Sequence, residues 1–332
     1  MPLVPEPRGP ITRLLVERLR RPLHALPGLP APSQEDPLGD DDLQLALYLC
    51  YELHYRGLDG VEDAWEWEPS LIALRGTLEA SFERALFDAI GPPATAPAAD
   101  EMDLALRAVG DEVDEPSLSC YIEREAPLGH VIEFLIHRSA YQLKEADPHS
   151  WALPRLYGAP KAALVEVQAD EYGGGRAERI HAQLFADTLA AVGLDPAYGA
   201  YLDRLPAETL ATVNLMSFLG LHRRWRGAIV GHLALFEMTS TIPNRRYAAG
   251  LRRLGQDGAA TAFFDEHVEA DAVHENIAAV DLAGGLARQQ PGLAADLLWG
   301  ARALAALDRR WSGRLLDHWA AGESSLRGPV AR

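Results

Sequence analysis

The stretch between Phe264 and Ala278, FDEHVEADAVHENIA, places two histidines and an aspartate at helical spacing. His267, Asp271 and His274 stand at positions i, i+4 and i+7, and no glycine or proline interrupts the stretch. On a helix these three side chains fall within an arc of about 60° over two turns. Imidazoles and carboxylates on one helical face are typical of metal sites built between helices. The pattern predicts that this helix contributes three ligands to a metal centre.

A second segment, residues 161–189, offers further ligands but needs a distorted helix to bring them together. Glu171 and His181 are ten residues apart, about 15 Å on a straight helix, which is too far for one dinuclear centre. Gly173–Gly175 lie between them and would cost roughly 1 kcal/mol each inside a helix, so they predict a bend or an unwound turn. Glu178 is the alternative, because Glu178 and His181 form the i, i+3 pair of ferritin-like carboxylate sites. We expect Glu171, because Glu178 leaves the glycines unexplained.

A third helix, expected over residues 127–146, carries two candidate glutamates, Glu133 and Glu145. It runs into a loop, and we expect the next helix to return antiparallel. Counting from that loop at 1.5 Å per residue places Glu133 nearly level with Glu171, whereas Glu145 is out of register by roughly four turns. Glu133 also lies between apolar neighbours, where an unpaired carboxylate would be costly. We therefore expect Glu133 to be the ligand from this helix. Three imidazoles and three carboxylates suit iron or manganese better than zinc, which prefers four ligands.

The elements that must position these side chains are helices. Alternating runs of β-branched residues do not occur, and apolar residues recur at helical spacing along the chain. We therefore expect an all-α protein with one bundled domain over residues 41–332. Residues 1–40 are rich in proline and arginine and are expected to form a tail, with a short amphipathic segment over 11–21. The expected helices lie near 41–55, 69–90, 101–109, 127–146, 160–189, 206–240, 244–254, 259–284 and 290–320.

Composition limits the classes of partner. The 332-residue chain has a formal net charge of −17, which argues against nucleic acid or an anionic membrane as the main partner. Two cysteines, Cys50 and Cys120, imply neither a disulfide framework nor a cysteine zinc site. No apolar run approaches the roughly 18 residues of a membrane span, and the N-terminus lacks the apolar core of a signal peptide. We expect a cytoplasmic protein.

The order of these residues resembles the haem-oxygenase-like diiron oxidases and oxygenases, a group of iron-containing redox enzymes. The resemblance rests on the blocks EFLIHRSAYQLKEADPHSWALPRL, VEVQADEYGGGRAERIHAQLFA and DEHVEADAVHE. It implies a haem-oxygenase-like bundle that holds two non-haem irons and uses O2 to oxidise a small organic substrate of amino-acid, amine or fatty-acid type. The ligands that it implies are Glu133, Glu171, His181, His267, Asp271 and His274.

A cluster of arginines suggests how a substrate would be held. A guanidinium binds a carboxylate in a planar, bidentate manner, and several arginines lie close together in the sequence of an acidic chain: Arg223, Arg224, Arg226, Arg245 and Arg246. They are weak candidates for a clamp on a substrate carboxylate, because pairing with acidic side chains would account for them equally well. Glu237, on the helix that follows, is a candidate extra ligand or proton relay.

Other functions compatible with the sequence are a haem-binding relative, a cofactor-independent oxidase of the same fold, and a helical metal-binding or partner-binding protein without catalysis. A homodimer is a candidate assembly.

Overall fold

The computed structural model describes residues 1–28, 35–94, 96–112 and 117–328, and within them the side chains of residues 271–273 are not described. These parts of the chain form helices joined by turns, and no strand occurs among them. The all-α fold class is confirmed.

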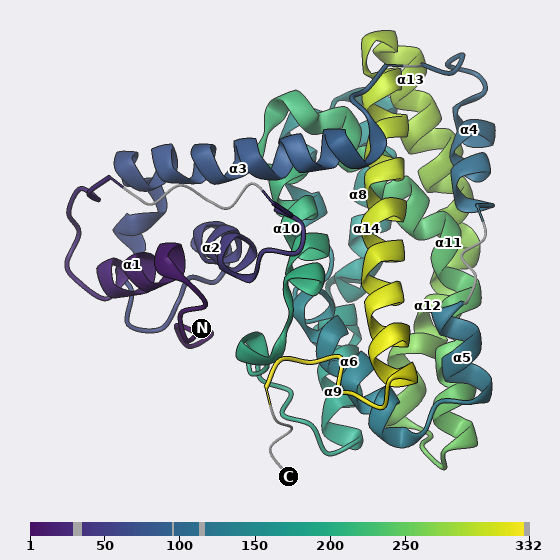
Figure 1. Cartoon of the computed structure of the whole chain (residues 1–332). Helices are drawn as coiled ribbons and strands as arrows, with labels where there is room; N and C mark the ends of the chain where they lie inside the picture. Colours follow the sequence, from purple (N-terminus) through teal and green to yellow (C-terminus); the bar gives the residue numbers. More distant parts are fainter. Residues whose placement is uncertain (29–34, 95, 113–116, 329–332) are drawn as a thin grey trace.

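Most of the longer helices run side by side in one bundle, which fills the right-hand part of Figure 1. Leucines, alanines and aromatic side chains from these helices are buried between them and form the core. The bundle helices are α6 (Leu128–Gln142), α8 (Gly158–Glu171), α9 (His181–Ala191), α10 (Ala207–Leu221), α11 (Arg226–Arg253), α12 (Ala259–Asn276) and α14 (Ala294–Ala320).

Short elements join the long helices and cover them. The short α-helices are α4 (Met102–Gly110), α5 (Leu118–Arg124), α7 (Asp147–Ser150) and α13 (Gly285–Gln289). The 3-10 turns are η1 (Asp63–Trp67), η2 (Leu153–Arg155), η3 (Gly173–Gly175), η4 (Ala177–Arg179), η5 (Leu202–Arg204), η6 (Arg223–Trp225) and η8 (Pro291–Leu293), and η7 (Ile277–Gly284) is a π-helical segment that continues α12.

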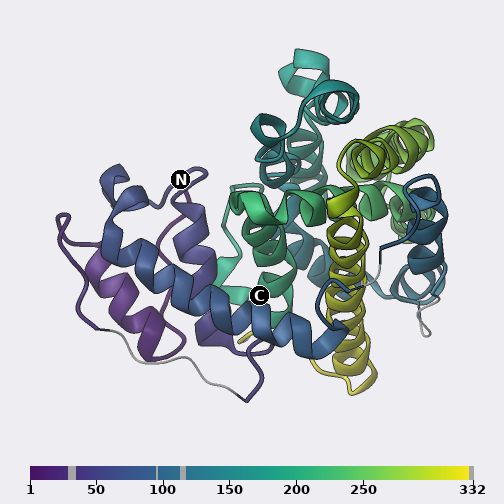
Figure 2. The same cartoon turned by 90° about the horizontal axis from the view of Figure 1, so that it is seen from above.

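The N-terminal helices gather on one side of the bundle, as Figure 2 shows from above. They are α1 (Pro10–Leu19), α2 (Asp41–Glu52) and α3 (Pro69–Ile90). The Asp42 carboxylate accepts hydrogen bonds from two backbone amides in the first turn of α1, at 2.8 Å each, which satisfies donors that a helix start leaves open. The expected helix near residues 11–21 therefore forms and is tied to α2. The division at residue 40 stays a prediction.

The helix expected over 160–189 breaks where the glycines stand. α8 ends at Glu171, all three glycines have positive φ, and α9 begins at His181. A Cβ at Gly173 would lie 2.6 Å from the carbonyl carbon of Arg179, so the loop folds back too tightly for any other residue there.

The break expected near residue 240 was wrong in position. Pro243 lies inside α11, and the chain instead bends at His222–Trp225, between α10 and α11. Tertiary contacts explain this choice, because the His222 imidazole lies 2.9 Å from the Glu79 carboxylate on α3 and the ring of Trp225 stacks on that of Trp299 at 4.8 Å. These contacts outweigh the tendency of Pro243 to interrupt a helix.

Candidate metal centre

Four buried side chains converge at the centre of the bundle. They are Glu145, Glu171, His181 and His267, and one ligand atom of each lies within 4.8 Å of the others. The closest pair is His181 Nδ1 and Glu171 Oε2 at 2.9 Å, and His267 Nε2 lies 3.5 Å from Glu145 Oε2. Glu171 ends α8 and His181 begins α9, so the glycine turn brings residues ten apart in sequence into contact.

A second group of ligand atoms shares Glu171 with the first. It consists of Glu171, Glu237 and His274, all of them buried, again with one ligand atom each within 4.8 Å. His274 Nδ1 lies 3.3 Å from Glu237 Oε2. Glu171 is therefore common to two groups of buried ligand atoms.

Unsatisfied buried atoms show that these residues fit a cation. Among the described residues, Glu145 Oε2, Glu171 Oε2, His181 Nδ1 and His274 Nδ1 are buried without a well-aligned hydrogen bond, and each approaches only other members of the cluster. Leaving such an atom unsatisfied costs about 1–3 kcal/mol, and more for a charged group. The four atoms belong to the two groups of donors, so metal coordination would satisfy all of them.

Space for an ion is present between the carboxylates. A cavity of about 10 Å³ is bounded by Glu145, Glu171, Glu237 and His267, close to the space that one water occupies. Phe236 also lines it, so the site is enclosed on that side by an apolar ring.

Hydrogen bonds orient two of the imidazoles. His267 Nδ1 lies 2.8 Å from the backbone carbonyl oxygen of Phe263, one turn earlier in α12. That carbonyl can only accept, so Nδ1 carries the proton and Nε2 presents its lone pair to the cluster. His274 Nε2 lies 3.0 Å from Asp170 Oδ2, which leaves Nδ1 facing Glu237. Partners of this kind fix the ring orientation of metal-binding histidines.

The electrostatics of the cluster favour positive charge. Burial alone would raise the pKa of the Glu171 carboxyl, but the neighbouring imidazoles, His181 first, lower that pKa to about 2. Burial would likewise lower the pKa of His274, but the nearby carboxylates, Glu237 first, raise it to about 9. Protonated imidazoles supply the positive charge in the metal-free protein, and a bound cation would take their place.

Glu145, not Glu133, stands at the cluster, so the expected level of the carboxylate on α6 was wrong. Glu145 follows the last residue of α6 in a tight turn, where the next residue, Ala146, has a φ of 72°. This conformation is strained for a residue other than glycine. The expected register assumed a longer loop, whereas α7 begins at once and the turn itself reaches the centre of the bundle.

Glu133 lies on α6, twelve residues before Glu145, and has a structural environment. Its Oε2 accepts hydrogen bonds from Trp319 Nε1 at 2.8 Å and from Ser325 Oγ at 2.7 Å, and its Oε1 accepts from Ser324 Oγ at 2.6 Å. The sequence argument that a carboxylate among apolar neighbours needs a partner was sound, but the partners are these polar groups of the C-terminal segment.

The other predicted ligands fall into three cases. Glu171, His181, His267 and His274 are brought together, and Glu178 lies exposed on η4, away from them. The side chain of Asp271 lies outside the described residues. Which of these side chains bind metal stays a prediction, because the observation is one of proximity.

Three of the arginines expected to clamp a substrate lie elsewhere. Arg223 and Arg224 are exposed, and Arg224 pairs with Glu83 on α3 at 3.1 Å. Arg226 binds Gln290 Oε1 at 3.0 Å and precedes Glu237 by eleven residues, about 16 Å along α11. They serve the packing of the bundle end, whereas Glu237 belongs to the second group of donors.

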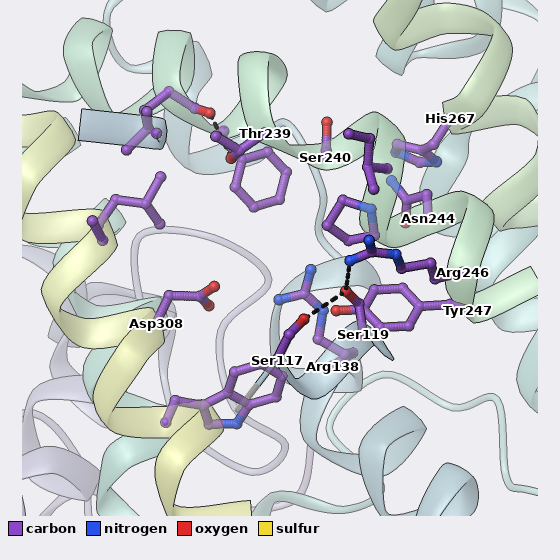
Figure 3. Close-up of a pocket in the computed structure, with 18 of the residues that line it drawn as sticks. Ser117, Ser119, Arg138, Thr239, Ser240, Asn244, Arg246, Tyr247, His267 and Asp308 are labelled. Atoms are coloured by element: carbon purple, nitrogen blue, oxygen red, sulfur yellow. Dashed lines mark hydrogen bonds between the residues drawn. The ribbon is translucent and has the colours of Figure 1, made fainter. Parts of the chain in front are cut away.

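A cavity of about 480 Å³ opens beside the cluster and is large enough for a small-molecule substrate. Glu145 and His267 of the cluster are among its lining residues, and Leu235, Phe236 and Phe263 line it with apolar surface. Figure 3 shows its polar side chains, which include Arg246, one of the arginines expected from the sequence to clamp a substrate, and Arg138, which was not expected there.

Comparison with known proteins agrees with this geometry. The model of a family described as iron-containing redox enzymes matches residues 132–309, more than half of the chain. The chain belongs to the iron-containing redox enzyme family. The matched region contains every described residue of the two donor groups, from Glu145 to His274.

A nitrosourea synthase from Streptomyces achromogenes subsp. streptozoticus is similar to part of this iron-containing redox enzyme. The two are 30% identical over 136 residues, which are 41% of this chain and 29% of the relative. The chain therefore matches less than a third of that relative's length.

Membership of the family makes the chain an oxidoreductase, so the non-catalytic alternative is set aside. The expected resemblance is confirmed. Of the helices described, none has both the length and the apolar character needed to cross a membrane.

Proposed function

We propose that the chain is a non-haem diiron enzyme that uses O2 to oxidise a small organic substrate. The observation that carries the proposal is the shared carboxylate: Glu171 belongs to both groups of donors. In this arrangement Glu145, His181 and His267 would hold one iron, Glu237 and His274 would hold the other, and Glu171 would bridge them. The relative's name points to a product with oxidised nitrogen, so oxidation at nitrogen is a candidate beside oxidation at carbon.

The two irons, when bound, would supply the electrons that reduce O2. The protein contributes the surroundings. Three buried carboxylates, Glu145, Glu171 and Glu237, offset the charge of the cations, and two hydrogen-bonded imidazoles hold their orientation. Phe236 and Phe263 give the cavity apolar surface beside Glu145 and His267. A substrate in the cavity would present one end to Glu145 and His267.

Iron binding to purified variants tests the shared ligand. Anaerobic titration with Fe(II) should give two equivalents for the parent protein, and the reduced protein should consume O2 faster when the true substrate is present. Glu171→Ala should lose both irons, because each group of donors loses a member. His274→Ala should lose one iron preferentially and keep the first group of donors intact.

Glu166→Ala is the matched control, because Glu166 is an exposed carboxylate on the same helix. It should bind iron as the parent does. A parent protein that binds one equivalent, or a Glu171→Ala variant that keeps two, would rule out the bridged centre. Circular dichroism of each variant distinguishes loss of metal from loss of fold.

A further inference from the structure

One guanidinium in the cavity has no anionic partner among the described residues. Arg138, on α6, is half-buried and lines the cavity. Its contact is the face of Trp311, with 5.4 Å between the guanidinium carbon and the ring centroid, and it makes no ion pair or hydrogen bond with any residue that the structure describes. A partly desolvated guanidinium without an anion is a costly feature to retain.

A second guanidinium lies beside it. Arg246, on α11, also lines the cavity and donates to Ser119 Oγ at 3.1 Å. Among the described residues its ion-pair partner is Glu123, whose Oε2 lies 4.0 Å from Arg246 Nε, so these residues compensate the charge only weakly. Figure 3 shows Arg138 and Arg246 near Ser119, with Ser117 next to it, and the two serine hydroxyls are 3.3 Å apart. Two cations and two hydroxyls at one place form a site for an anion.

α6 and the turn after it connect this place to the candidate metal centre. Arg138 and Gln142 lie on α6, four residues and about 6 Å apart along the helix, and Glu145 follows in the turn after the helix. All three line the cavity. Gln142 stands between the other two in the sequence and is 3% exposed, and its Oε1 is buried without a hydrogen-bond partner among the described residues. The wall of the cavity thus carries the Arg138 guanidinium, then the Gln142 amide, and then Glu145 of the candidate metal centre.

We infer that the cavity binds an elongated carboxylic acid by its carboxylate, which Arg138 and Arg246 hold at the end remote from the metal centre. The reacting atom is then far along the molecule from the carboxylate, and a polar group in the middle of the chain hydrogen-bonds to Gln142. Asp308 and Arg309 line the wall that α14 provides, and Arg309 lies 3.5 Å from Glu112. The assignment of the reacting end rests on the proposed function, whereas the anion site does not.

Thiol labelling tests the anion site without metal or turnover. The chain has two cysteines: Cys120 lines the cavity and is partly exposed, whereas Cys50 is buried. A water-soluble maleimide should label Cys120, and a ligand in the cavity should slow that reaction. Nonanoate should protect Cys120 in both the iron-free and the Fe(II)-loaded protein. Nonan-1-ol and nonylamine, of the same chain length, should give at least about tenfold weaker protection.

Variants assign the effect to the two arginines. Arg138→Gln and Arg246→Gln should each raise the nonanoate concentration for half-protection by about tenfold or more, and Arg138→Lys should restore part of the affinity. Arg245→Gln is the matched control, because Arg245 is the exposed neighbour of Arg246 on α11. It should behave as the parent. Unlabelled Cys50 verifies that each variant is folded.

A second ligand tests Gln142. The compound 6-acetamidohexanoate has nonanoate's chain length with an amide in the chain, and it should lose more affinity than nonanoate when Gln142 is changed to leucine. Equal protection by nonan-1-ol and nonanoate, or full protection of Arg138→Gln and Arg246→Gln, would overturn the anion site. Protection as expected with no O2 consumption would instead keep the anion site and refute the diiron function.

Discussion

At the residue scale, Glu133 on α6 and Glu145 in the turn after it show that a buried carboxylate can have either a structural or a functional role. Both Glu133 and Glu145 are buried, at 9% and 4% exposure. Glu133 is satisfied by tryptophan and serine donors, and these hydrogen bonds, which outweigh the effect of burial, lower the pKa of its carboxyl. Glu145 has an oxygen without such donors and faces an imidazole instead. A buried carboxylate oxygen that accepts no hydrogen bond and lies beside other possible metal ligands indicates a cation site. A buried carboxylate that accepts several hydrogen bonds indicates a structural role.

Substitution of the two glutamates should therefore have opposite consequences. Glu145→Ala should weaken iron binding at the first group of donors, with the fold retained, because it removes one ligand from an already enclosed site. Glu133→Ala should keep the iron content but lower the free energy of unfolding by about 2–4 kcal/mol, since several buried donors lose their acceptor. Iron analysis and urea unfolding of both variants measure this. Iron loss in Glu133→Ala at unchanged stability would contradict the assignment.

At the element scale, the sequence predicts the helices well and their ends less well. Long stretches with strong periodicity, such as α3 and α14, appear near the expected bounds. The four-residue α7 and the seven-residue α5 were not expected, because such short segments carry too little periodicity to detect. Glu145 was misplaced for a different reason: its position depends on a turn whose geometry is set by contacts distant in sequence. The glycine break was predictable, because three consecutive glycines are costly inside a helix.

The glycine turn offers a matched pair of substitutions. Gly173→Ala should destabilise the protein by roughly 2–4 kcal/mol, for two reasons. Alanine is strained at a positive φ, and its Cβ would clash with the backbone of Arg179. It should also lower iron content, since Glu171 and His181 meet only if the turn closes. Gly174→Ala should cost only about 1–2 kcal/mol and keep the iron, because Gly174 also has a positive φ but its added Cβ would meet no atom within 4 Å. Thermal unfolding and iron analysis compare the two variants.

Equal effects of Gly173→Ala and Gly174→Ala on stability and iron content would show that backbone conformation alone, and not the close approach to residue 179, decides whether the turn forms.

At the scale of the whole molecule, one buried ion pair ties the N-terminal helices to the metal centre. Lys144 Nζ lies 3.2 Å from Glu52 Oε2, and the two side chains are 1% and 0% exposed. Tyr198 donates a hydrogen bond to the same carboxylate oxygen at 2.6 Å, and the Lys144 ammonium lies over the ring of Tyr55, 4.4 Å from its centroid. Lys144 directly precedes Glu145, so α2 helps to hold the turn that carries a candidate ligand.

The same turn is held from the other side by α8. Gln168 Nε2 donates to the carbonyl oxygen of Ala146 at 2.9 Å, one turn before Glu171. The strained backbone at Ala146 persists because contacts from α2 and α8 surround it. Helices that are far apart in the chain thus set the position of one carboxylate, and this is why no argument from α6 alone could find it.

A double-mutant cycle separates the stability of this ion pair from its effect on the centre. Lys144→Met and Glu52→Leu should each destabilise the protein by about 3–5 kcal/mol, because each leaves one buried charge without its partner. The double variant should recover most of that loss, since two apolar side chains of similar volume replace the pair and buried ion pairs contribute little net stability.

Iron affinity should follow a different pattern from stability. If the ion pair positions Glu145, the double variant should bind iron more weakly than the parent even though its stability is largely recovered, because an apolar contact leaves the turn freer to move. Arg75→Met is a useful control, since Arg75 pairs with Glu79 at 3.3 Å in the N-terminal helices but does not touch the turn. Its iron affinity should equal that of the parent. Parental iron affinity in the double variant would mean that the pair only fills space between α2 and the bundle, and that α8 alone holds the turn.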